Sequence, residues 1–321
     1  MTRLRRLSLG GLIRAFGLIA AACGGDDTPE TTEGTTPPLE TTEAPAATEA
    51  PAETEAPAET TTTTAAPAFD LVAAVGAYES TMPEGWMNVG DVVAFKDAVA
   101  ASDALVIDIR QPSEYAEGHI PGSVNIPLRE LAANVDKIPT DRQVFVYCKS
   151  GYRAAVGNSA LRMMGYDNAL SFSGSWLAWT AAEEEVSTEA VEAEVVGDPG
   201  FAPELVAAVD GFLSTIPEGW LIVDLDTVKA GIDAGAFILD IRTPAEYAEG
   251  HIEGAVNIPL RELTARMSEI PKDVSVIVHC KSGFRAALSA PVLGVLGYDN
   301  FKVFNGSYKA WVEAGEPVVT G

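Results

Sequence analysis

The chain has 321 residues, enough for about two ordinary domains. Its 46 acidic residues outnumber its 21 basic residues and give a net charge of −25, which argues against nucleic-acid binding and against docking on anionic lipid, because both need a basic face. Three scattered cysteines exclude a small disulfide-stapled scaffold and, with only three histidines, disfavour a structural zinc site. No apolar run of about 18 residues is present, so we expect no membrane-spanning helix in the mature protein.

Residues 1–23 have the order of an export signal. Arginines near the start precede an apolar stretch, and small residues lead into Cys23. A Cys directly after small residues resembles the signal of a bacterial lipoprotein, in which this Cys becomes the lipidated N-terminus. The resemblance implies an exported protein of the cell envelope, lipid-anchored to the membrane through Cys23 on the extracytoplasmic side. A plain secretory signal and an unprocessed N-terminus are the alternatives.

Residues 24–68 are predicted to form a disordered tether. The segment consists mainly of Thr, Glu, Ala and Pro, and it holds ten acidic residues and no basic one. Such a composition cannot bury enough apolar surface to offset the entropy of ordering the chain. Proline and like-charge repulsion keep it extended. We interpret the segment as an acidic spacer between the anchor and the globular part.

The rest of the chain contains the same unit twice. Three motifs recur at an offset of 132 positions: Asp108-Ile109-Arg110 as 240–242, residues 114–120 as 246–252, and Cys148-Lys149-Ser150-Gly151 as 280–283. A period this long is typical of duplicated domains rather than of a solenoid. We place the domains at residues 69–181 and 201–321, with an acidic linker at 182–200.

Short β-branched runs alternate with helical patterns in each unit. Strands are predicted at 105–109, 144–147 and 169–172, and again at 237–241, 274–278 and 301–304. Helices are predicted at 92–100, 128–135, 152–164 and 284–296. This alternation favours a parallel α/β sheet covered on both faces, in which ligands bind at the carboxyl ends of the strands. Trp86 and Trp220, near the starts of the units, are expected in the core.

Cys148 and Cys280 each follow a predicted buried strand and precede a predicted helix. A loop that turns from a strand end into a helix start points backbone N–H groups inward, and the helix N-terminus adds positive potential. A Cys at the beginning of such a loop is expected to be largely thiolate at neutral pH. The pattern indicates a nucleophile inside an anion-binding loop. A buried structural Cys and a disulfide between Cys148 and Cys280 are the alternatives.

The loop residues have the properties that an anionic substrate requires. They are Lys149, Ser150, Gly151, Tyr152 and Arg153 in the first unit and Lys281, Ser282, Gly283, Phe284 and Arg285 in the second. The glycine allows backbone angles that a side chain would forbid, and the arginine carries a permanent planar charge suited to an oxyanion. Asp108 and Asp240, at strand ends, are expected to support neighbouring loops by hydrogen bonds, with Arg110 and Arg242 as their partners.

Both units resemble rhodanese domains over nearly all of their length. The resemblance rests on the Asp-Ile-Arg motif, on the segments 115–126 and 247–258, and on the loops 148–153 and 280–285. It implies two tandem α/β domains, each a parallel sheet flanked by helices on both faces, and it carries the family's catalytic Cys over to Cys148 and Cys280. Ser123 and Glu253 depart from the family's usual Ala and Pro, but both lie outside the loops. Two-domain relatives often lack the Cys in the first domain, whereas both loops are intact here.

The activity implied by the resemblance is sulfur transfer through a cysteine persulfide, from a small anionic donor such as thiosulfate to a thiol or cyanide. It requires no metal or organic cofactor. Two other functions stay open. One is a non-catalytic rhodanese module that binds or senses sulfur at the cell surface. The other is a Cys-based phosphatase or arsenate reductase, which is disfavoured because those loops place one residue more between Cys and Arg than the four found here. The sequence leaves the oligomeric state open.

Overall fold

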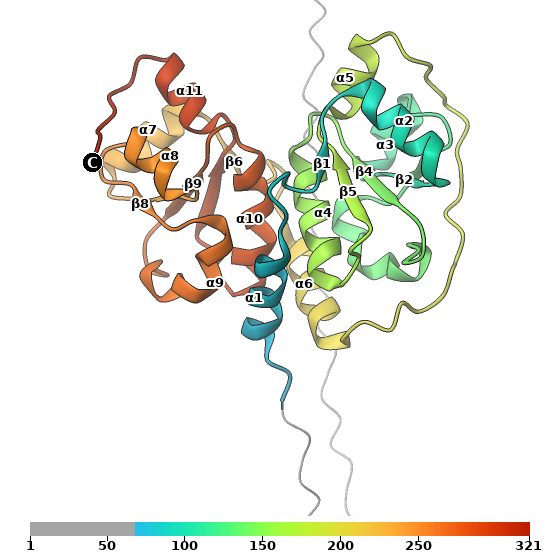
Figure 1. Cartoon of the computed structure of the whole chain (residues 1–321), viewed down its shortest axis with the longest axis horizontal. Coiled ribbons are helices and arrows are strands. Elements are labelled where there is room, and N and C mark those ends of the chain that lie inside the picture. Colours follow the sequence, from blue (N-terminus) through green and yellow to red (C-terminus); the bar gives the residue numbers. More distant parts are fainter. Residues whose placement is uncertain (1–67) are drawn as a thin grey trace, which may run out of the picture. The chain divides into compact units, whose positions relative to one another are not determined.

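The computed structural model describes residues 68–321, which belong to one compact unit (Figure 1). The predictions of an export signal, of a lipid on Cys23 and of a tether concern residues that lie outside this range, except for residue 68 itself. Within the described range, no helix is long and apolar enough to cross a membrane.

The first half contains a five-stranded parallel sheet. Its strands are β1 (Asn88–Val89), β2 (Leu105–Asp108), β3 (Val124–Asn125), β4 (Val144–Tyr147) and β5 (Ala169–Phe172), in the spatial order β1-β5-β4-β2-β3. All four side chains of the central strand β4 are buried, which its run of Val, Phe, Val and Tyr favours. Asp108 pairs with Tyr147, so β2 and β4 end side by side.

The second half repeats this sheet. Its strands are β6 (Ile222–Val223), β7 (Phe237–Asp240), β8 (Val256–Asn257), β9 (Val276–His279) and β10 (Phe301–Phe304), in the order β6-β10-β9-β7-β8. The predicted strand at 274–278 begins two residues later, because Val274 is exposed and does not enter the sheet. Two parallel sheets flanked by helices confirm the predicted fold class.

Helices cover both faces of each sheet. In chain order, the helices of the first half are α1 (Leu71–Thr81), which packs mainly against the second half, α2 (Val92–Ser102), α3 (Pro112–Glu117), α4 (Tyr152–Met164) and α5 (Ser175–Ala181). In the second half they are α6 (Pro203–Thr215), α7 (Leu225–Asp233), α8 (Pro244–Glu249), α9 (Leu263–Arg266), α10 (Phe284–Val295) and α11 (Ser307–Glu313). Phe145 of β4 packs with Phe95 of α2 and Trp179 of α5, whereas Val144 and Val146 belong to the core on the opposite face, with α4.

The stretch predicted as a helix at 128–135 is a pair of tighter 3₁₀ turns, η1 (Leu128–Glu130) and η2 (Ala132–Lys137). Asn134 has a non-helical φ of −117°, and its side chain donates to the carbonyl of Glu130. This local hydrogen bond competes with the regular helix. The second half has η3 (Leu260–Glu262), α9 and η4 (Met267–Glu269) at the corresponding place.

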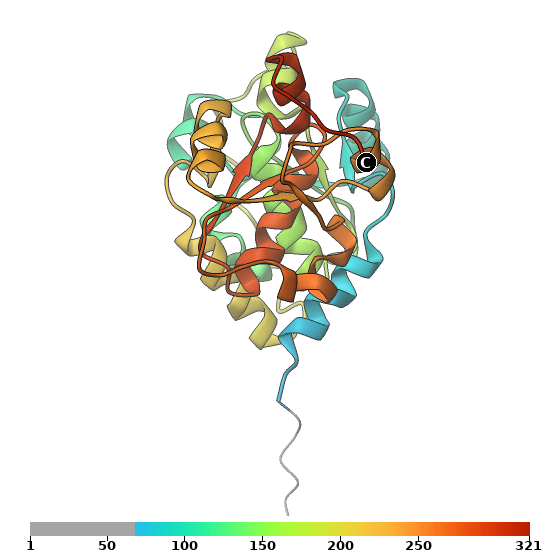
Figure 2. The ribbon, with the colours of Figure 1, turned by 90° about the vertical axis from the view of Figure 1, so that its left-hand side faces the viewer.

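The two halves exchange their N-terminal helices. Helix α1 packs against η3 and α9 of the second half, and α6 packs against η1 and η2 of the first. Figure 2 shows α1 (blue) and α6 (yellow) on either side of the central pair α4 and α10. Two polar contacts mark the exchange: the backbone N–H of Thr264 donates to the carboxyl of Glu79, and Nε of Arg129 donates to the carbonyl of Ile216 at 2.7 Å.

Helices α4 and α10 form the centre of the interface between the halves. A short chain of buried hydrogen bonds crosses it: Tyr78 donates to the hydroxyl of Ser159, which donates to the carbonyl of Leu288, each at 2.8 Å. One apolar core runs through both halves at this interface. Because α4 and α10 begin directly after the two cysteine loops, the interface also fixes where those loops lie.

Candidate active site

Cys148 lies at the carboxyl end of β4, and its backbone and sulfur are both held by hydrogen bonds. The N–H of Gly151 is directed at Sγ of Cys148 at 3.2 Å, and the N–H of Cys148 donates to Oγ of Ser175 at 3.2 Å. The carbonyls of Cys148 and Lys149 accept from backbone N–H groups of α5. The loop is therefore fixed between the starts of α4 and α5.

Cys280 has the same surroundings at the end of β9. The N–H of Gly283 is directed at Sγ of Cys280 at 3.1 Å, and the N–H of Cys280 donates to Oγ of Ser307 at 3.1 Å. Both cysteines are free thiols, so the predicted alternative of a disulfide between them is wrong in this structure. Each sulfur thus sits where a backbone N–H can stabilise negative charge on it.

The glycines of the two loops cannot be replaced without strain. Gly151 and Gly283 have φ values of +97° and +103°, which L side chains rarely adopt. A Cβ on Gly151 would lie 2.3 Å from the carbonyl oxygen of Ser173, and a Cβ on Gly283 would lie 2.0 Å from that of Asn305. The loop turns this tightly only because these positions have no side chain.

The last arginine of each loop is paired with a carboxylate. Arg153 donates to both carboxyl oxygens of Glu114 at 2.7 and 2.8 Å, and Arg285 donates to both of Glu246 at 2.6 and 2.7 Å. Hydrogen bonds from Arg285 lower the pKa of Glu246 to about 2. Burial raises the pKa of Glu114, but the hydrogen bonds from Arg153 and from the N–H of Gln111, together with the charges of Arg153 and Arg110, leave it lowered. The expectation that these arginines bind an oxyanion directly stays a prediction, since each already has a bidentate partner.

Asp108 and Asp240 lie fully buried at the ends of β2 and β7. Arg110 donates to both oxygens of Asp108 and to the carbonyl of Gly118, and Arg242 does the same with Asp240 and Gly250. These pairs tie the end of each strand to the carbonyl of the glycine that follows α3 or α8. The expectation that they support neighbouring loops stays a prediction.

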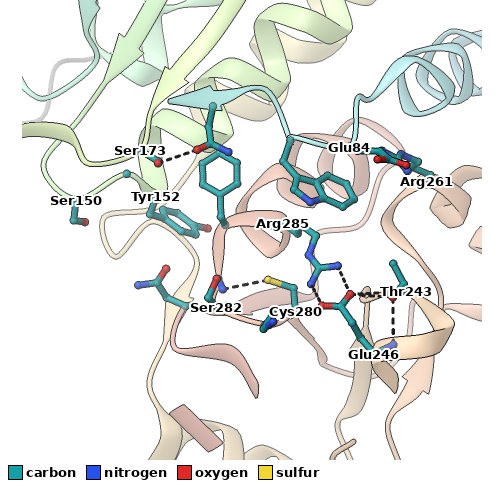
Figure 3. Close-up of a pocket in the computed structure, with 17 residues that line it drawn as sticks. Glu84, Ser150, Tyr152, Ser173, Thr243, Glu246, Arg261, Cys280, Ser282 and Arg285 are labelled. Atoms are coloured by element: carbon teal, nitrogen blue, oxygen red, sulfur yellow. Dashed lines mark hydrogen bonds and ion pairs between the residues drawn. The ribbon is translucent and has the colours of Figure 1, made fainter. Parts of the chain in front are cut away.

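A cavity of about 830 Å³ lies between the halves and is lined by both loops (Figure 3). Its lining includes Cys280 and the rest of that loop, together with Ser150, Gly151 and Tyr152 of the first loop. Trp86 and Glu84, which precede β1, close it from the first half. A substrate in this cavity would touch both halves at once.

Comparison with known proteins identifies the family. The family model of the rhodanese-like domain matches residues 91–182 and 224–314. The chain belongs to the rhodanese-like family.

Several curated relatives of this rhodanese-like chain are named as sulfurtransferases. A sulfurtransferase of Allochromatium vinosum is 42 % identical over 82 residues, which are 26 % of this chain and 77 % of that protein. Thiosulfate sulfurtransferase 18 of Arabidopsis thaliana is 32 % identical over 33 % of this chain and 89 % of its own length. The 3-mercaptopyruvate sulfurtransferase of Escherichia coli is 25 % identical over 62 % of this chain and 82 % of its own. Three further curated relatives are matched over 60, 62 and 50 % of their length.

Sequence reasoning missed several residues that hold the rhodanese-like loops. Ser175 and Ser307 accept the N–H of the cysteines, Glu114 and Glu246 hold the arginines, and Trp86 and Trp220 stack on arginines rather than lying wholly in the core. All six recur between the repeats. The Gly-Ser pair after β5 and β10 and the Glu before each Tyr were visible signals. The stacking of the tryptophans was not visible, because it joins residues from different halves.

Proposed function

We propose that the protein is a sulfurtransferase that carries sulfane sulfur as a persulfide on Cys148 and on Cys280. The observation that carries the proposal is the backbone N–H directed at each sulfur, from Gly151 at 3.2 Å and from Gly283 at 3.1 Å. Membership of the rhodanese-like family and the names of the relatives support sulfur transfer in general. Thiosulfate as donor and cyanide or a thiol as acceptor are the finer part of the proposal.

The reaction needs two nucleophilic displacements. In the first, the Cys thiolate attacks the outer sulfur of thiosulfate, the S–S bond of thiosulfate breaks, and sulfite leaves with the electron pair. The transferred sulfur keeps the negative charge as Cys–S–S⁻. In the second, cyanide or a thiolate attacks this terminal sulfur, which leaves as thiocyanate or as a new persulfide and returns the Cys thiolate. Electrons balance without a third reactant.

The loops suit this chemistry because every species in it is an anion. The thiolate, the donor, sulfite and the persulfide all gain from N–H groups that are already oriented, since no reorganisation is needed at the moment of reaction. The N-termini of α4 and α10 add positive potential at the same place. Cys280 lines the 830 Å³ cavity, which leaves room for donor and acceptor.

The test is an assay of sulfur transfer from thiosulfate to cyanide on the full chain, paired with intact mass after donor alone. Wild type, Cys148→Ser, Cys280→Ser and the double variant are compared. We expect turnover, and a mass gain of one sulfur atom per intact loop, both absent only from the double variant. Replacing thiosulfate by 3-mercaptopyruvate, and cyanide by a thiol, defines the donor and acceptor.

Two results would overturn the proposal. A folded protein with free thiols that gives neither turnover nor adduct with any of these donors supports a non-catalytic binding or sulfur-sensing module instead. Hydrolysis of a phosphate monoester, or reduction of arsenate, that depends on the same cysteines would support the phosphatase or arsenate reductase alternative.

We also propose that the protein is exported and lipid-anchored through Cys23. The support is the order of residues 1–23, which resembles a lipoprotein signal. Expressed from the full-length chain in a bacterial host, the protein is expected in the membrane fraction, and Cys23→Ser is expected to release it. Membrane association that survives Cys23→Ser would contradict the proposal.

A further inference from the structure

Each half places one tryptophan against the cysteine loop of the other half. The ring of Trp86, which follows α1, lies 5.3 Å from Cζ of Arg285 and 4.9 Å from Cζ of Arg261. The ring of Trp220, which follows α6, lies 4.9 Å from Cζ of Arg153 and 4.7 Å from Cζ of Arg129. The same contact between halves is therefore made twice, in opposite directions. Figure 3 shows Arg285 directed at Glu246, with which it forms an ion pair.

The backbone at both tryptophans is held in an unfavourable conformation. Trp86 and Met87 both have φ +56°, and Trp220 and Leu221 have φ +56° and +64°. Such values are uncommon for residues with side chains and cost free energy at each position. Two consecutive strained residues at equivalent places in both halves indicate that the packing of each tryptophan compensates for the strain.

The arginine at the end of each loop is held from two sides. Glu246 holds the edge of the Arg285 guanidinium through two hydrogen bonds, and Trp86 covers its face. Burial lowers the pKa of Arg285, but its hydrogen bonds and charge interactions with Glu246 and Cys280 together leave it raised. The arginine therefore belongs to the electrostatic surroundings of the sulfur as well as to the loop.

We propose that Trp86 is a positioning residue for the Cys280 loop and Trp220 for the Cys148 loop, so that each site is complete only when the other half is present. The inference rests on the proposed sulfur transfer. Without its tryptophan, the guanidinium face is open to water and the ion pair with the glutamate loosens. The first turn of α4 or α10 then shifts, and the backbone N–H of Gly151 or Gly283 no longer points at the cysteine sulfur. A misplacement of about 1 Å can cost a catalytic site roughly 100-fold.

The test uses proteins with one reactive cysteine each. Trp86→Ala and Trp220→Ala are introduced separately into Cys148→Ser and into Cys280→Ser, in the full chain. With Cys280 as the remaining nucleophile, we expect Trp86→Ala to lower turnover by at least about tenfold more than Trp220→Ala does. With Cys148 remaining, the order is expected to reverse. Trp86→Phe keeps an aromatic face and is expected to recover part of the loss at Cys280.

A second readout separates positioning from stability and from the proposed function. The rate at which iodoacetamide alkylates the single cysteine is measured against pH, which reports on the thiolate without needing turnover. We expect Trp86→Ala to shift this profile for Cys280 and Trp220→Ala to shift it for Cys148. Equal effects of both variants on both cysteines, in turnover and in alkylation, would overturn the inference. If no variant transfers sulfur but the alkylation profiles follow the crossed pattern, the proposed function fails and the positioning role stands.

A separate observation concerns Tyr152, the first residue of α4. Its side chain is only 6 % exposed, and its hydroxyl finds no hydrogen-bond partner among residues 68–321. Burial raises its pKa, so the hydroxyl keeps its proton and can donate. Tyr152 lines the cavity that contains Cys280, and Figure 3 shows its ring directed at the second loop. The corresponding residue of the second half is Phe284, which has no hydroxyl.

We infer that the Tyr152 hydroxyl donates a hydrogen bond to an oxygen of the anionic donor bound at Cys280. This also rests on the proposed function and names its substrate class: a sulfane-sulfur donor that carries an oxyanion group. An unpartnered buried hydroxyl destabilises the empty protein, because it has lost its hydrogen bonds to water. That loss is recovered when a ligand oxygen accepts the bond.

The inference predicts opposite effects of Tyr152→Phe on stability and on binding. In the Cys148→Ser protein, we expect Tyr152→Phe to raise Tm without ligand and to raise KM for thiosulfate by about tenfold, with little change in kcat. Tyr166→Phe is the matched control: the Tyr166 hydroxyl is bonded to the carbonyl of Val135 at 2.8 Å, so its loss is expected to lower Tm. A fall in Tm with Tyr152→Phe, or an unchanged KM in a protein that does transfer sulfur, would overturn the inference.

Discussion

The two halves share their cysteine loops but differ in what lies behind them. In the first half, Tyr147 precedes the cysteine, and its hydroxyl accepts from the N–H of Ile120 at 3.1 Å and contacts Ser123. In the second half His279 takes this place, and its Nε2 lies 3.6 Å from Oδ2 of Asp240. Both arrangements are fully buried, and the N–H to sulfur distances differ by only 0.1 Å. The loop geometry therefore depends on the glycine, serine and glutamate that the halves share, not on the residue behind the cysteine.

The exchanged helices show a second difference. Helix α6 buries Leu213, whereas α1 has Glu79 at the equivalent place, and this residue is only 2 % exposed. Glu79 accepts the backbone N–H of Thr264 at 3.0 Å. The same packing role is thus filled by an apolar side chain on one side and by an ionisable one on the other. The two sides of the interface should respond differently to pH.

The largest effect is expected from the feature that the halves share. Gly151→Ala and Gly283→Ala each place a methyl group against a backbone carbonyl and impose strain at a positive φ. In the single-cysteine proteins, each is expected to lower sulfur transfer at its own cysteine by about 100-fold or more. Turnover with each cysteine measures this. A variant that keeps its sulfur-transfer rate with alanine at position 151 or 283 would contradict this prediction.

A smaller effect is expected from Glu79. Burial raises its pKa from 4.5 to about 7, so the folded state binds this proton more tightly than the unfolded chain does. The stability that Glu79 contributes is fully present below about pH 4.5 and is lost as pH rises through 7, by up to about 3 kcal/mol. Glu79→Gln, or Glu79→Leu to match α6, is expected to be more stable than wild type at pH 8 and similar to it at pH 4.5.

Urea unfolding at both pH values checks this prediction, because the titrations of all other groups cancel in the difference between wild type and variant. Leu213→Gln in α6 is the control on the other side, and it is expected to destabilise at every pH, since it buries an amide with no partner at that place. A variant at position 79 whose stability differs from wild type by a constant amount at all pH values would contradict the assignment.

How much of this the sequence could predict depends on how far apart the contacting residues lie. The strands and the start of α4 follow from local runs such as Val144–Tyr147, because β-branched and aromatic residues there can only be buried. The cysteine loop follows from one strand, one glycine and one helix. The contacts of Trp86 and Trp220 could not be predicted, because the two halves have nearly the same loop sequence. Each tryptophan could pack against the loop of its own half or against that of the other half. The packing of α4 on α10 determines which of the two loops it contacts.

The smallest effect is expected where His279 replaces Tyr147. Burial lowers the pKa of His279 from 6.5, and although Asp240 opposes this, Arg242 and His251 add to it. Because the pKa of His279 is lower in the folded state than in the unfolded chain, acid protonates the unfolded chain first. The protein therefore loses stability as pH falls below about 6.5, the pKa of an unfolded histidine. His279→Phe is expected to remove this loss of stability in acid, whereas Glu79→Gln removes a loss of stability at high pH. Tyr147→Phe is the control, because Tyr147 does not titrate in this range. It is expected to leave the slope of the unfolding free energy against pH unchanged below about pH 6.5. The measurement is the unfolding free energy of wild type, His279→Phe and Tyr147→Phe between about pH 5 and 7. A slope unchanged by His279→Phe would mean that His279 binds its proton equally well in the folded and unfolded states, and it would contradict the lowered pKa.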